Sequence, residues 1–311
     1  MKKVCVVILN WNGRDLTLGC LEDLQKSDYP NVECVIVDNG STDGSAEAIG
    51  KAFPNGRLVR NSTNLGWAGG SNQGMAWGLT HDADYVLLLN NDVRTDPAMI
   101  SNLVAAAVAF QDQVVTIPKI YLGSDPGRFW FARGRVNFWT GLFSNPAFNL
   151  TDGGQFDSSP EVEYASGCCV LIPRGIAERV GRFDETFFSY VEDVDWSIRC
   201  RRAGYRIVLC PVAKLWHDVS VTGKKRPAVM RYYLTRNHLW TMRRHASLFQ
   251  FASSLLFLPL RSLWRIVRLL LAGDGKSVMA ELRGLKDGLL GAVAPTNLVG
   301  SSPNSLKEGN R

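Results

Sequence analysis

The chain lacks the sequence features of several large protein classes. Its seven cysteines are odd in number and never occur with CxxC spacing, which argues against a disulfide framework and a zinc ribbon. It contains neither GxGxxG nor a P-loop ending in GK[ST], which disfavours dinucleotide-binding and ATP-hydrolysing enzymes. Its apolar start reaches polar Asn10 too early for the core of a signal peptide. We therefore expect a protein of a reducing cytosol that begins with a buried strand.

The composition is that of an ordinary globular enzyme, but the charge is unevenly distributed. The 311 residues are 46% hydrophobic and 21% charged, which allows a sizeable core. From Lys224 onward there are 15 Lys and Arg against 4 Asp and Glu, whereas residues 1–223 hold 20 against 25. A basic tail that is also apolar suggests a membrane surface or a nucleic acid as its partner.

Strand and helix patterns alternate over the first 110 residues or so. This alternation predicts an α/β fold with a mostly parallel, doubly wound sheet and right-handed crossovers. The expected strands are Val4–Leu9, Val32–Val37, Leu58–Val59 and Tyr85–Leu89. The expected helices are Leu16–Leu24, Ser45–Ala52, one containing Met75–Leu79, and Met99–Phe110.

Polar residues follow each expected strand. The fourth strand ends in Asn90-Asn91-Asp92, and a lone carboxylate in the crevice outside strand ends suits Mg²⁺ or Mn²⁺ shared with a diphosphate. The alternative is a simple turn, since these residues also form turns. Asp38 follows the second strand, where its carboxylate can accept from a base N–H or a ribose hydroxyl. The glycines of Asn64–Asn72 allow the backbone to approach a phosphate or ribose closely.

Four of these segments resemble, in the same order, the motifs of glycosyltransferase family 2, and more narrowly of its bacterial rhamnosyltransferase-like branch. They are Asn10–Gly13, Val37–Ser45, Asn64–Asn72 and Leu89–Val93. The resemblance covers residues 3–245 and implies a GT-A fold, which is Rossmann-like with a mostly parallel sheet flanked by helices. It also implies transfer of a sugar from a nucleoside diphosphate sugar with inversion of configuration. Residues 1–223 would be the catalytic domain, with a nucleotide-sugar half (1–110) and an acceptor half (111–223).

The resemblance assigns roles to individual residues. It makes Asn90-Asn91-Asp92 a variant of the family's DXD metal motif, in which Asn91 stands where many members carry Asp. It implies Mg²⁺ or Mn²⁺ held by Asp92 and His217, and a nucleoside held by Asn10, Asp38, Asn64, Gly66 and Asn91. The favoured donor is dTDP-rhamnose, with UDP- and GDP-sugars as alternatives. The acceptor would be a lipid-linked or polysaccharide hydroxyl in bacterial cell-surface glycan synthesis.

An acidic cluster in the second half carries the expected acid–base chemistry. Glu192, Asp193 and Asp195 begin a helical pattern, where the helix dipole alone can account for acids. Asp195 can pair with Arg199 at i+4, whereas Asp193 lies off that stripe and is free to act as the base for an acceptor hydroxyl. The resemblance also favours the second acid of the pair. We expect Asp193 to be the base, with Glu192 and Trp196 at the acceptor.

Three further segments carry weaker predictions. His217 is expected in a loop after the strand Ile207–Leu209, where the resemblance implies contact with the metal or the diphosphate; a structural role is the alternative. The aromatic-rich segment Ser124–Asp157 is typical of an acceptor loop, or else of a covering insertion. Ser166 and Gly167 are expected to line a donor or acceptor pocket.

The basic region 224–292 is predicted to be helical and amphipathic. Arg261, Arg265 and Arg268 interrupt its apolar pattern, which argues against a transmembrane span and favours a helix lying on anionic lipid. A homodimer contact is the alternative, and nucleic acid is disfavoured because no binding motif for it appears. We expect residues 293–311 to be disordered and the protein to be peripheral on the cytoplasmic face of the plasma membrane.

Two rival classes remain open. One is a sugar-phosphate nucleotidyltransferase, which the absence of a Gly-rich, basic first loop disfavours. The other is a non-catalytic GT-A-like subunit that binds a membrane or a partner, which the intact acidic motifs disfavour.

Overall fold

The computed structural model describes residues 1–54, 56–158, 161–218 and 227–292. In this part of the chain the strands are β1 (Val4–Asn10), β2 (Val32–Asp38), β3 (Arg57–Arg60), β4 (Tyr85–Asn90), β5 (Val93–Thr95), β6 (Val114–Leu122), β7 (Asp125–Phe131), β8 (Arg135–Asn137), β9 (Leu142–Ser144), β10 (Glu161–Val162), β11 (Cys169–Pro173) and β12 (Arg206–His217). The helices are α1 (Arg14–Leu24), α2 (Ser45–Ala52), α3 (Gly66–Thr80), α4 (Met99–Ala109), α5 (Arg174–Val180), the short η1 (Glu185–Phe187), α6 (Glu192–Arg202), α8 (Pro227–His245), α9 (Leu248–Leu271) and α10 (Gly275–Leu290).

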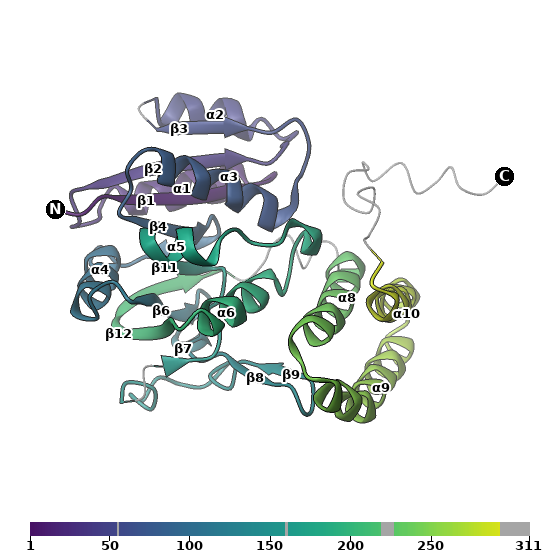
Figure 1. Cartoon of the computed structure of the whole chain (residues 1–311). Helices are drawn as coiled ribbons and strands as arrows, with labels where there is room; N and C mark the ends of the chain where they lie inside the picture. Colours follow the sequence, from purple (N-terminus) through teal and green to yellow (C-terminus); the bar gives the residue numbers. More distant parts are fainter. Residues whose placement is uncertain (55, 159–160, 219–226, 293–311) are drawn as a thin grey trace.

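One mixed sheet with flanking helices forms the body of the protein (Figure 1). Its order is β3-β2-β1-β4-β11-β6-β12-β10, with β5 beside β12 and β7 beside β6. The first half, β3 to β4, is parallel throughout, which confirms the alternating pattern predicted for residues 1–110. Beyond it β11 runs antiparallel to both of its neighbours, so the sheet is less uniformly parallel than expected.

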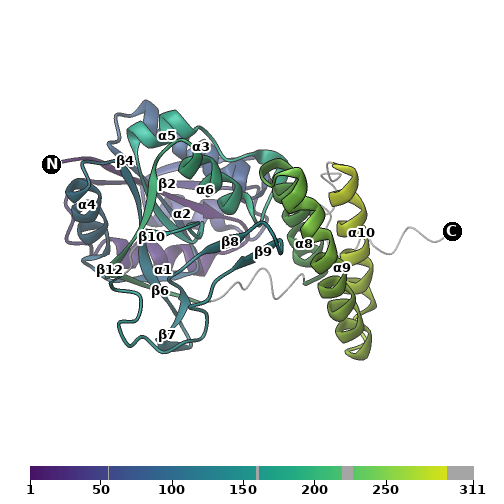
Figure 2. The same cartoon turned by 60° about the horizontal axis from the view of Figure 1, so that its bottom comes forward.

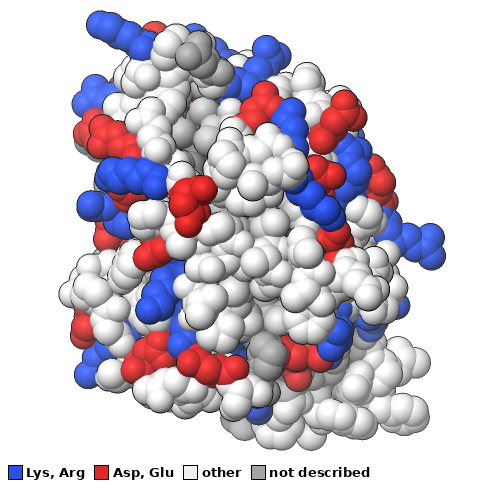
Figure 3. All heavy atoms as spheres, turned by 90° about the vertical axis from the view of Figure 1, so that its left-hand side faces the viewer, with Lys and Arg blue, Asp and Glu red and all other residues white. Residues whose placement is uncertain are grey.

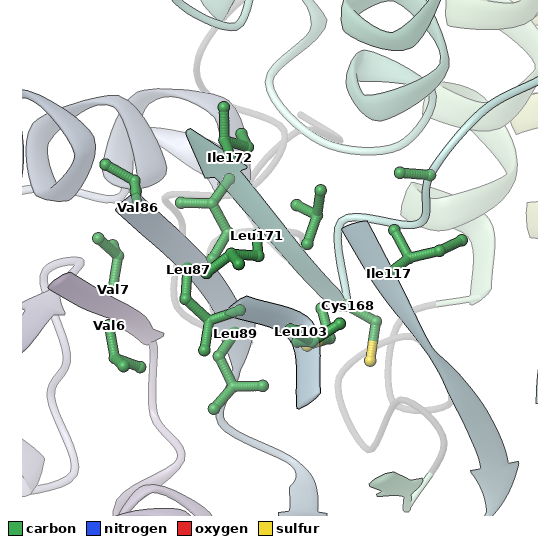
Figure 4. Close-up of a cluster of buried hydrophobic side chains, with 14 of the residues drawn as sticks. Val6, Val7, Val86, Leu87, Leu89, Leu103, Ile117, Cys168, Leu171 and Ile172 are labelled. Carbon is green, nitrogen blue, oxygen red and sulfur yellow. The ribbon is translucent and has the colours of Figure 1, made fainter. Parts of the chain in front are cut away.

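The core is centred on β1, β4 and β11, whose side chains are almost wholly buried. Figure 4 shows the apolar residues of these strands meeting Leu103 from α4 and Ile117 from β6. Helix α3 lies close against β1 because it presents glycines there. A Cβ atom at Gly74 would lie 2.1 Å from the Val7 side chain. The strands carry no polar side chain until they end, and this directs the polar residues to the sheet edge.

Strand β12 differs from the prediction. We expected His217 in a loop beyond a strand at Ile207–Leu209, but the strand continues to His217 and pairs with both β6 and β5. The register shifts between Cys210 and Lys214, so an irregularity divides the strand. Because this break interrupts the apolar pattern, the sequence predicts a strand that ends too early, at Leu209.

The last three helices lie side by side at one end of the sheet (Figures 1 and 2). Helix α10 packs along α8 and also contacts α9, and α9 begins with a capping box between Ser247 and Gln250. The described part of region 224–292 is therefore helical, as predicted. The boundary at 223 and the segment Lys224–Arg226 lie outside the described residues, as does the tail from 293.

Candidate active site

A cavity of about 930 Å³ lies between the sheet and the three last helices. Its walls come from the ends of β1 and β4, from the start of α6, and from β9, α8 and α9. The polar strand ends that the sequence singles out thus face this cavity. The cavity is within the usual range for small-molecule sites, which is roughly 300–1,000 Å³.

The end of the parallel sheet brings the predicted nucleoside-binding residues together. Asn10 pairs in register with Asp38, and its side-chain amide donates to that carboxylate at 2.7 Å. Its side-chain oxygen accepts from Thr17 at 2.8 Å, and the Asn91 amide donates to the same threonine at 2.9 Å. Asn10 is 0% exposed and does not line the cavity, so the structure does not bring it to the cavity wall, and its contact with the nucleoside stays a prediction.

Asp38 and Asn91 have different positions in this network. Asp38 is buried, its second oxygen accepts from the Ser41 backbone, and it does not line the cavity. Asn91 does line the cavity. Nucleoside contact by these two residues stays a prediction, and the shared network shows that both support the shape of the strand ends.

The loop before α3 forms another wall of the cavity. Asn64 and Gly66 line it, as predicted, together with Asn39, which the sequence analysis did not select. The Asn39 amide donates to the Asn64 side chain and to the Gly66 carbonyl, both at 2.9 Å. Gly66 has φ +76°, and a Cβ there would lie 2.2 Å from the Phe188 carbonyl oxygen. Only glycine fits this close approach.

Asp92 and His217, 125 residues apart in the chain, meet at the cavity. Strand β5 starts directly after Asp92 and pairs with β12, so His217 lies opposite Val93. The His217 Nε2 atom is 3.0 Å from Asp92 Oδ1, and the ring packs edge-on against Trp130. The remaining ring nitrogen, Nδ1, is buried without a partner among the described residues.

This pair fits a divalent metal shared with a substrate. Two ligand atoms that are each about 2.0–2.1 Å from Mg²⁺ and at right angles lie roughly 3 Å apart, which is the separation of the Asp92 and His217 atoms. Among the described residues, no three His, Cys, Asp or Glu side chains gather in a metal-binding group. Further ligands would therefore be oxygens of a diphosphate, as is usual for Mg²⁺.

Glu192 and Asp193 start α6 and lie at the middle of the cavity wall. Asp193 accepts hydrogen bonds from the backbone N–H groups of Gly167 at 2.9 Å and Val194 at 2.8 Å. Glu192 is 5% exposed, and its Oε2 has no partner among the described residues. Burial raises the pKa of both carboxyls, and the neighbouring Asp193 raises that of Glu192 further.

The two acids differ in how their charged forms are stabilised. Hydrogen bonds from backbone N–H groups stabilise a carboxylate. Asp193 accepts two such bonds, and they oppose the rise in its pKa that burial causes. The pKa of Glu192 is raised by burial and by the neighbouring Asp193, whereas the two backbone N–H groups favour the ionised form of Asp193. The role of Asp193 as the base stays a prediction.

A strained loop leads into these acids. Phe188, Tyr190 and Val191 all have positive φ, which is costly for residues with a Cβ and most of all for a β-branched valine. Asn237 of α8 donates to three carbonyls of this loop, those of Phe187, Ser189 and Tyr190, at 2.7–3.0 Å. The buried Arg236 donates to the Thr186 and Phe187 carbonyls. Helix α8 is therefore part of the active-site framework, which the sequence analysis missed.

Trp196 does not reach the acceptor side of the cavity. It is 1% exposed, its indole N–H donates to the Gly181 carbonyl at 2.8 Å, and its ring stacks on Phe183. The position of Trp196 on α6 turns its side chain into the core and not to the cavity, and its role at the acceptor stays a prediction. The predicted pair between Asp195 and Arg199 is confirmed at 2.9 Å.

The aromatic segment contributes part of the cavity wall. Trp130, Phe131 and Phe143 line it, whereas Trp139 is 56% exposed and does not. Ser166 and Gly167 line it as predicted. The adjacent Cys168 is also at the wall, but burial raises the pKa of its thiol well above the usual range, so it is a poor nucleophile.

The fold and this cavity define a GT-A glycosyltransferase. Residues 5–181 match the model of the glycosyl transferase family 2, and the chain belongs to that family. It is 30% identical over 236 residues to an N-acetylglucosaminyl-diphospho-decaprenol L-rhamnosyltransferase of Mycobacterium tuberculosis, covering 69% of this chain and 76% of that protein. It is 23% identical to the dTDP-rhamnosyl transferase RfbF of Shigella flexneri, covering 78% and 80%.

Solved structures share the fold at low sequence identity. A mannosyltransferase of Pyrobaculum calidifontis, in complex with GDP-Man and Mn²⁺, matches with a TM-score of 0.59 and 16% identity over 92% of this chain and 87% of that one. GalNAc-T7 with UDP, GalNAc and Mn²⁺ matches with a TM-score of 0.60 and 16% identity over 78% of this chain. The match spans 48%, about half, of the GalNAc-T7 chain.

Proposed function

We propose that this glycosyltransferase transfers a sugar, with rhamnose as the best candidate, from a nucleoside diphosphate sugar to a hydroxyl of a lipid-linked acceptor, with inversion. The observation that carries the proposal is the single cavity that joins Asp92 and His217 to the base candidate Asp193. A departing diphosphate and an attacking hydroxyl both need stabilisation at one site, and this cavity supplies both.

In this proposal different residues of the cavity bind the metal, shape the nucleoside site and act as the base. Asp92 and His217 would hold Mg²⁺ or Mn²⁺, which when bound supplies positive charge to the departing nucleoside diphosphate. Asn64 and Gly66 shape the wall for the nucleoside. Asp193 accepts the proton of the acceptor hydroxyl while that oxygen attacks the anomeric carbon from the opposite face. One displacement of this kind inverts the configuration and needs no covalent enzyme intermediate.

The names of two relatives support a particular donor and acceptor for this enzyme. Both are named for rhamnosyl transfer, one with a dTDP-linked donor and one with a diphospho-decaprenol acceptor. These names support dTDP-rhamnose and a lipid diphosphate acceptor for this chain, with UDP- and GDP-sugars as the alternatives. A role in bacterial cell-surface glycan synthesis follows from the same relationship.

The surface of α9 supports a peripheral position on the cytoplasmic side of an anionic membrane. Its outward residues are 59–87% exposed at Leu248, Phe249, Leu256, Leu260, Leu263, Trp264 and Leu271. None of the described helices has both the length and the apolar character needed to cross a bilayer. By contrast, the face of the molecule opposite these helices carries Lys and Arg side by side with Asp and Glu, so it does not have the apolar character of α9 (Figure 3). An exposed apolar helix that also presents Arg268 suits an anionic lipid surface, and a homodimer contact through α9 is the alternative.

Donor turnover tests the proposed function. Purified protein is incubated with dTDP-rhamnose and a panel of UDP- and GDP-sugars with Mg²⁺ or Mn²⁺, and release of nucleoside diphosphate is measured. We expect release from one donor, no release after chelation, and loss of release in Asp92→Ala and Asp193→Asn. The exposed Asp28 provides a control, because Asp28→Asn changes the same charge away from the cavity.

The pH profile separates the base from a structural residue. Burial raises the pKa of Asp193, so the acid limb of kcat/KM should lie at higher pH than for an ordinary aspartate. A folded Asp193→Asn variant with full activity, or a wild-type enzyme without this acid limb, would show that another group takes the proton.

A further inference from the structure

Three arginines gather at the end of the cavity formed by α8 and α9. Arg231, Arg261 and Arg265 all line it, and none of them entered the catalytic proposal. Arg265 donates to Glu281 at 2.7 and 3.1 Å, and Arg231 lies 4.0 Å from the same carboxylate. Glu281 is 0% exposed and accepts also from Thr235, so this single acid is fully engaged.

The cluster keeps an excess of positive charge. Arg261 donates to the carbonyls of Gly141 at 2.7 Å and Thr140 at 3.2 Å, and it makes no ion pair with a described residue. Its Nε atom is buried without a hydrogen-bond partner in that same set. Three guanidinium groups against one carboxylate leave two positive charges at a cavity wall. Arginine stays protonated there, so the excess charge favours an anion in the cavity.

The surroundings of the cluster are apolar. Leu142, Phe143, Leu234 and Leu258 line the same cavity, and Leu258 lies with Arg261 on the inward side of α9. A free phosphate or nucleotide would gain little from such walls. A diphosphate joined to a hydrocarbon chain matches both the charge and the apolar surface.

We propose that Arg231 and Arg261, supported by Arg265, bind the diphosphate of a lipid diphosphate-linked acceptor, whose hydrocarbon chain packs against the apolar residues of the same cavity. The sugar of this acceptor then extends towards Asp193. The inference rests on the proposed function and deepens it, because it gives the acceptor's diphosphate a site separate from Asp92 and His217. The donor's diphosphate and the acceptor's diphosphate thus contact different residues of one cavity.

Farnesyl diphosphate, a short soluble prenyl diphosphate, tests this site directly. Its binding to the full chain is measured by calorimetry in EDTA, since chelation removes the divalent ion that a diphosphate would need at Asp92. Farnesol and inorganic pyrophosphate serve as the matched probes. We expect farnesyl diphosphate to bind about tenfold or more tightly than either of them.

Charge-removing variants assign the binding to the cluster. Arg231→Gln and Arg261→Gln should each weaken farnesyl diphosphate binding about tenfold or more. Arg261→Lys keeps the charge and should restore part of the loss. Arg268→Gln is the control, because Arg268 lies on α9, stacks on Trp264 and lines neither end of the cavity. Arg265 is left intact, since its removal would leave Glu281 buried without its main partner.

Three results would overturn the inference. Equal binding of farnesol and farnesyl diphosphate by the wild-type chain would exclude a diphosphate site, and this comparison needs no variant. Equal binding of pyrophosphate would exclude the lipid part. Binding to phosphatidylglycerol vesicles that falls in Arg261→Gln but not in Arg268→Gln would assign these arginines to the membrane. Donor turnover that persists alongside any of these would leave the proposed function standing.

Discussion

Replacing Asn237 with alanine should remove most of the turnover of this enzyme and leave its fold in place. The side-chain amide of Asn237 donates to three carbonyls in the loop before the catalytic acids, at 2.7–3.0 Å. Two amide hydrogens shared among three acceptors correspond to roughly 1–3 kcal/mol of stabilisation. The positive φ angles of Phe188, Tyr190 and Val191 cost about 1–3 kcal/mol each. The strain of the three residues, about 3–9 kcal/mol together, exceeds the contribution of Asn237, so the loop depends on all the contacts that hold it and loss of Asn237 favours its relaxation.

Relaxation of the loop displaces Asp193, because Asp193 lies only two residues after Val191 in the chain. A displacement of about 1 Å at a catalytic group lowers the rate roughly a hundredfold. We expect kcat to fall by about this factor in Asn237→Ala, with a decrease in thermal midpoint of only a few degrees. Asn237→Asp keeps the shape but replaces donors by acceptors, so it should be at least as inactive.

The assay combines donor turnover with hydrogen exchange of the peptide 186–192. Asn102→Ala is the matched control, because Asn102 also donates from a helix to a backbone carbonyl of another element, that of Val212 in β12, but away from the cavity. We expect faster exchange in peptide 186–192 only for the Asn237 variants. An Asn237→Ala enzyme with unchanged kcat and unchanged exchange would refute the argument that α8 holds this loop.

Two further predictions follow from the same wall of the cavity. Because burial raises the pKa of Glu192 above its unfolded value, folding stability falls as pH rises from about 4.5 towards the folded pKa, by at most about 1.4 kcal/mol per pH unit. Glu192→Gln should remove this part of the slope, measured as thermal midpoint against pH, and an unchanged slope would assign it to another group. Gly66→Ala places a Cβ 2.2 Å from the Phe188 carbonyl oxygen, so donor release should be lost; a fully active variant would show that this contact is not needed.

The sequence predicted the first half of the sheet and the polar strand ends that reach the cavity, because both depend on local patterns. Apolar runs that end in polar residues identified β1, β2 and β4, and glycines identified the loop at Gly66. The order of the motifs then gave the family, which the comparison with known proteins shows. The site assignments at Asp92 and Asp193 remain predictions until turnover is measured.

The side-chain positions that the sequence could not show have physical reasons. Nothing near Asn10 in the sequence shows that Thr17 and Asp38 satisfy its amide, and those contacts arise from strand pairing. Trp196 follows the acids by one helical turn, but the direction of its side chain depends on how α6 packs. Asn237 was missed because it holds backbone carbonyls, which carry no sequence signature.

The cavity is assembled from two stretches of chain that are far apart, and this bears on how such enzymes diversify. Donor-side residues belong to the chain up to His217, of which residues 5–181 match the family, whereas the arginine end belongs to the helices from Pro227 onward. Chimeras between relatives can therefore exchange α9 and α10 as a module. The junction should follow His245, so that α8 stays with the loop it supports. Changes in α9 and α10 can then alter which acceptor the enzyme uses without altering the residues that bind the donor.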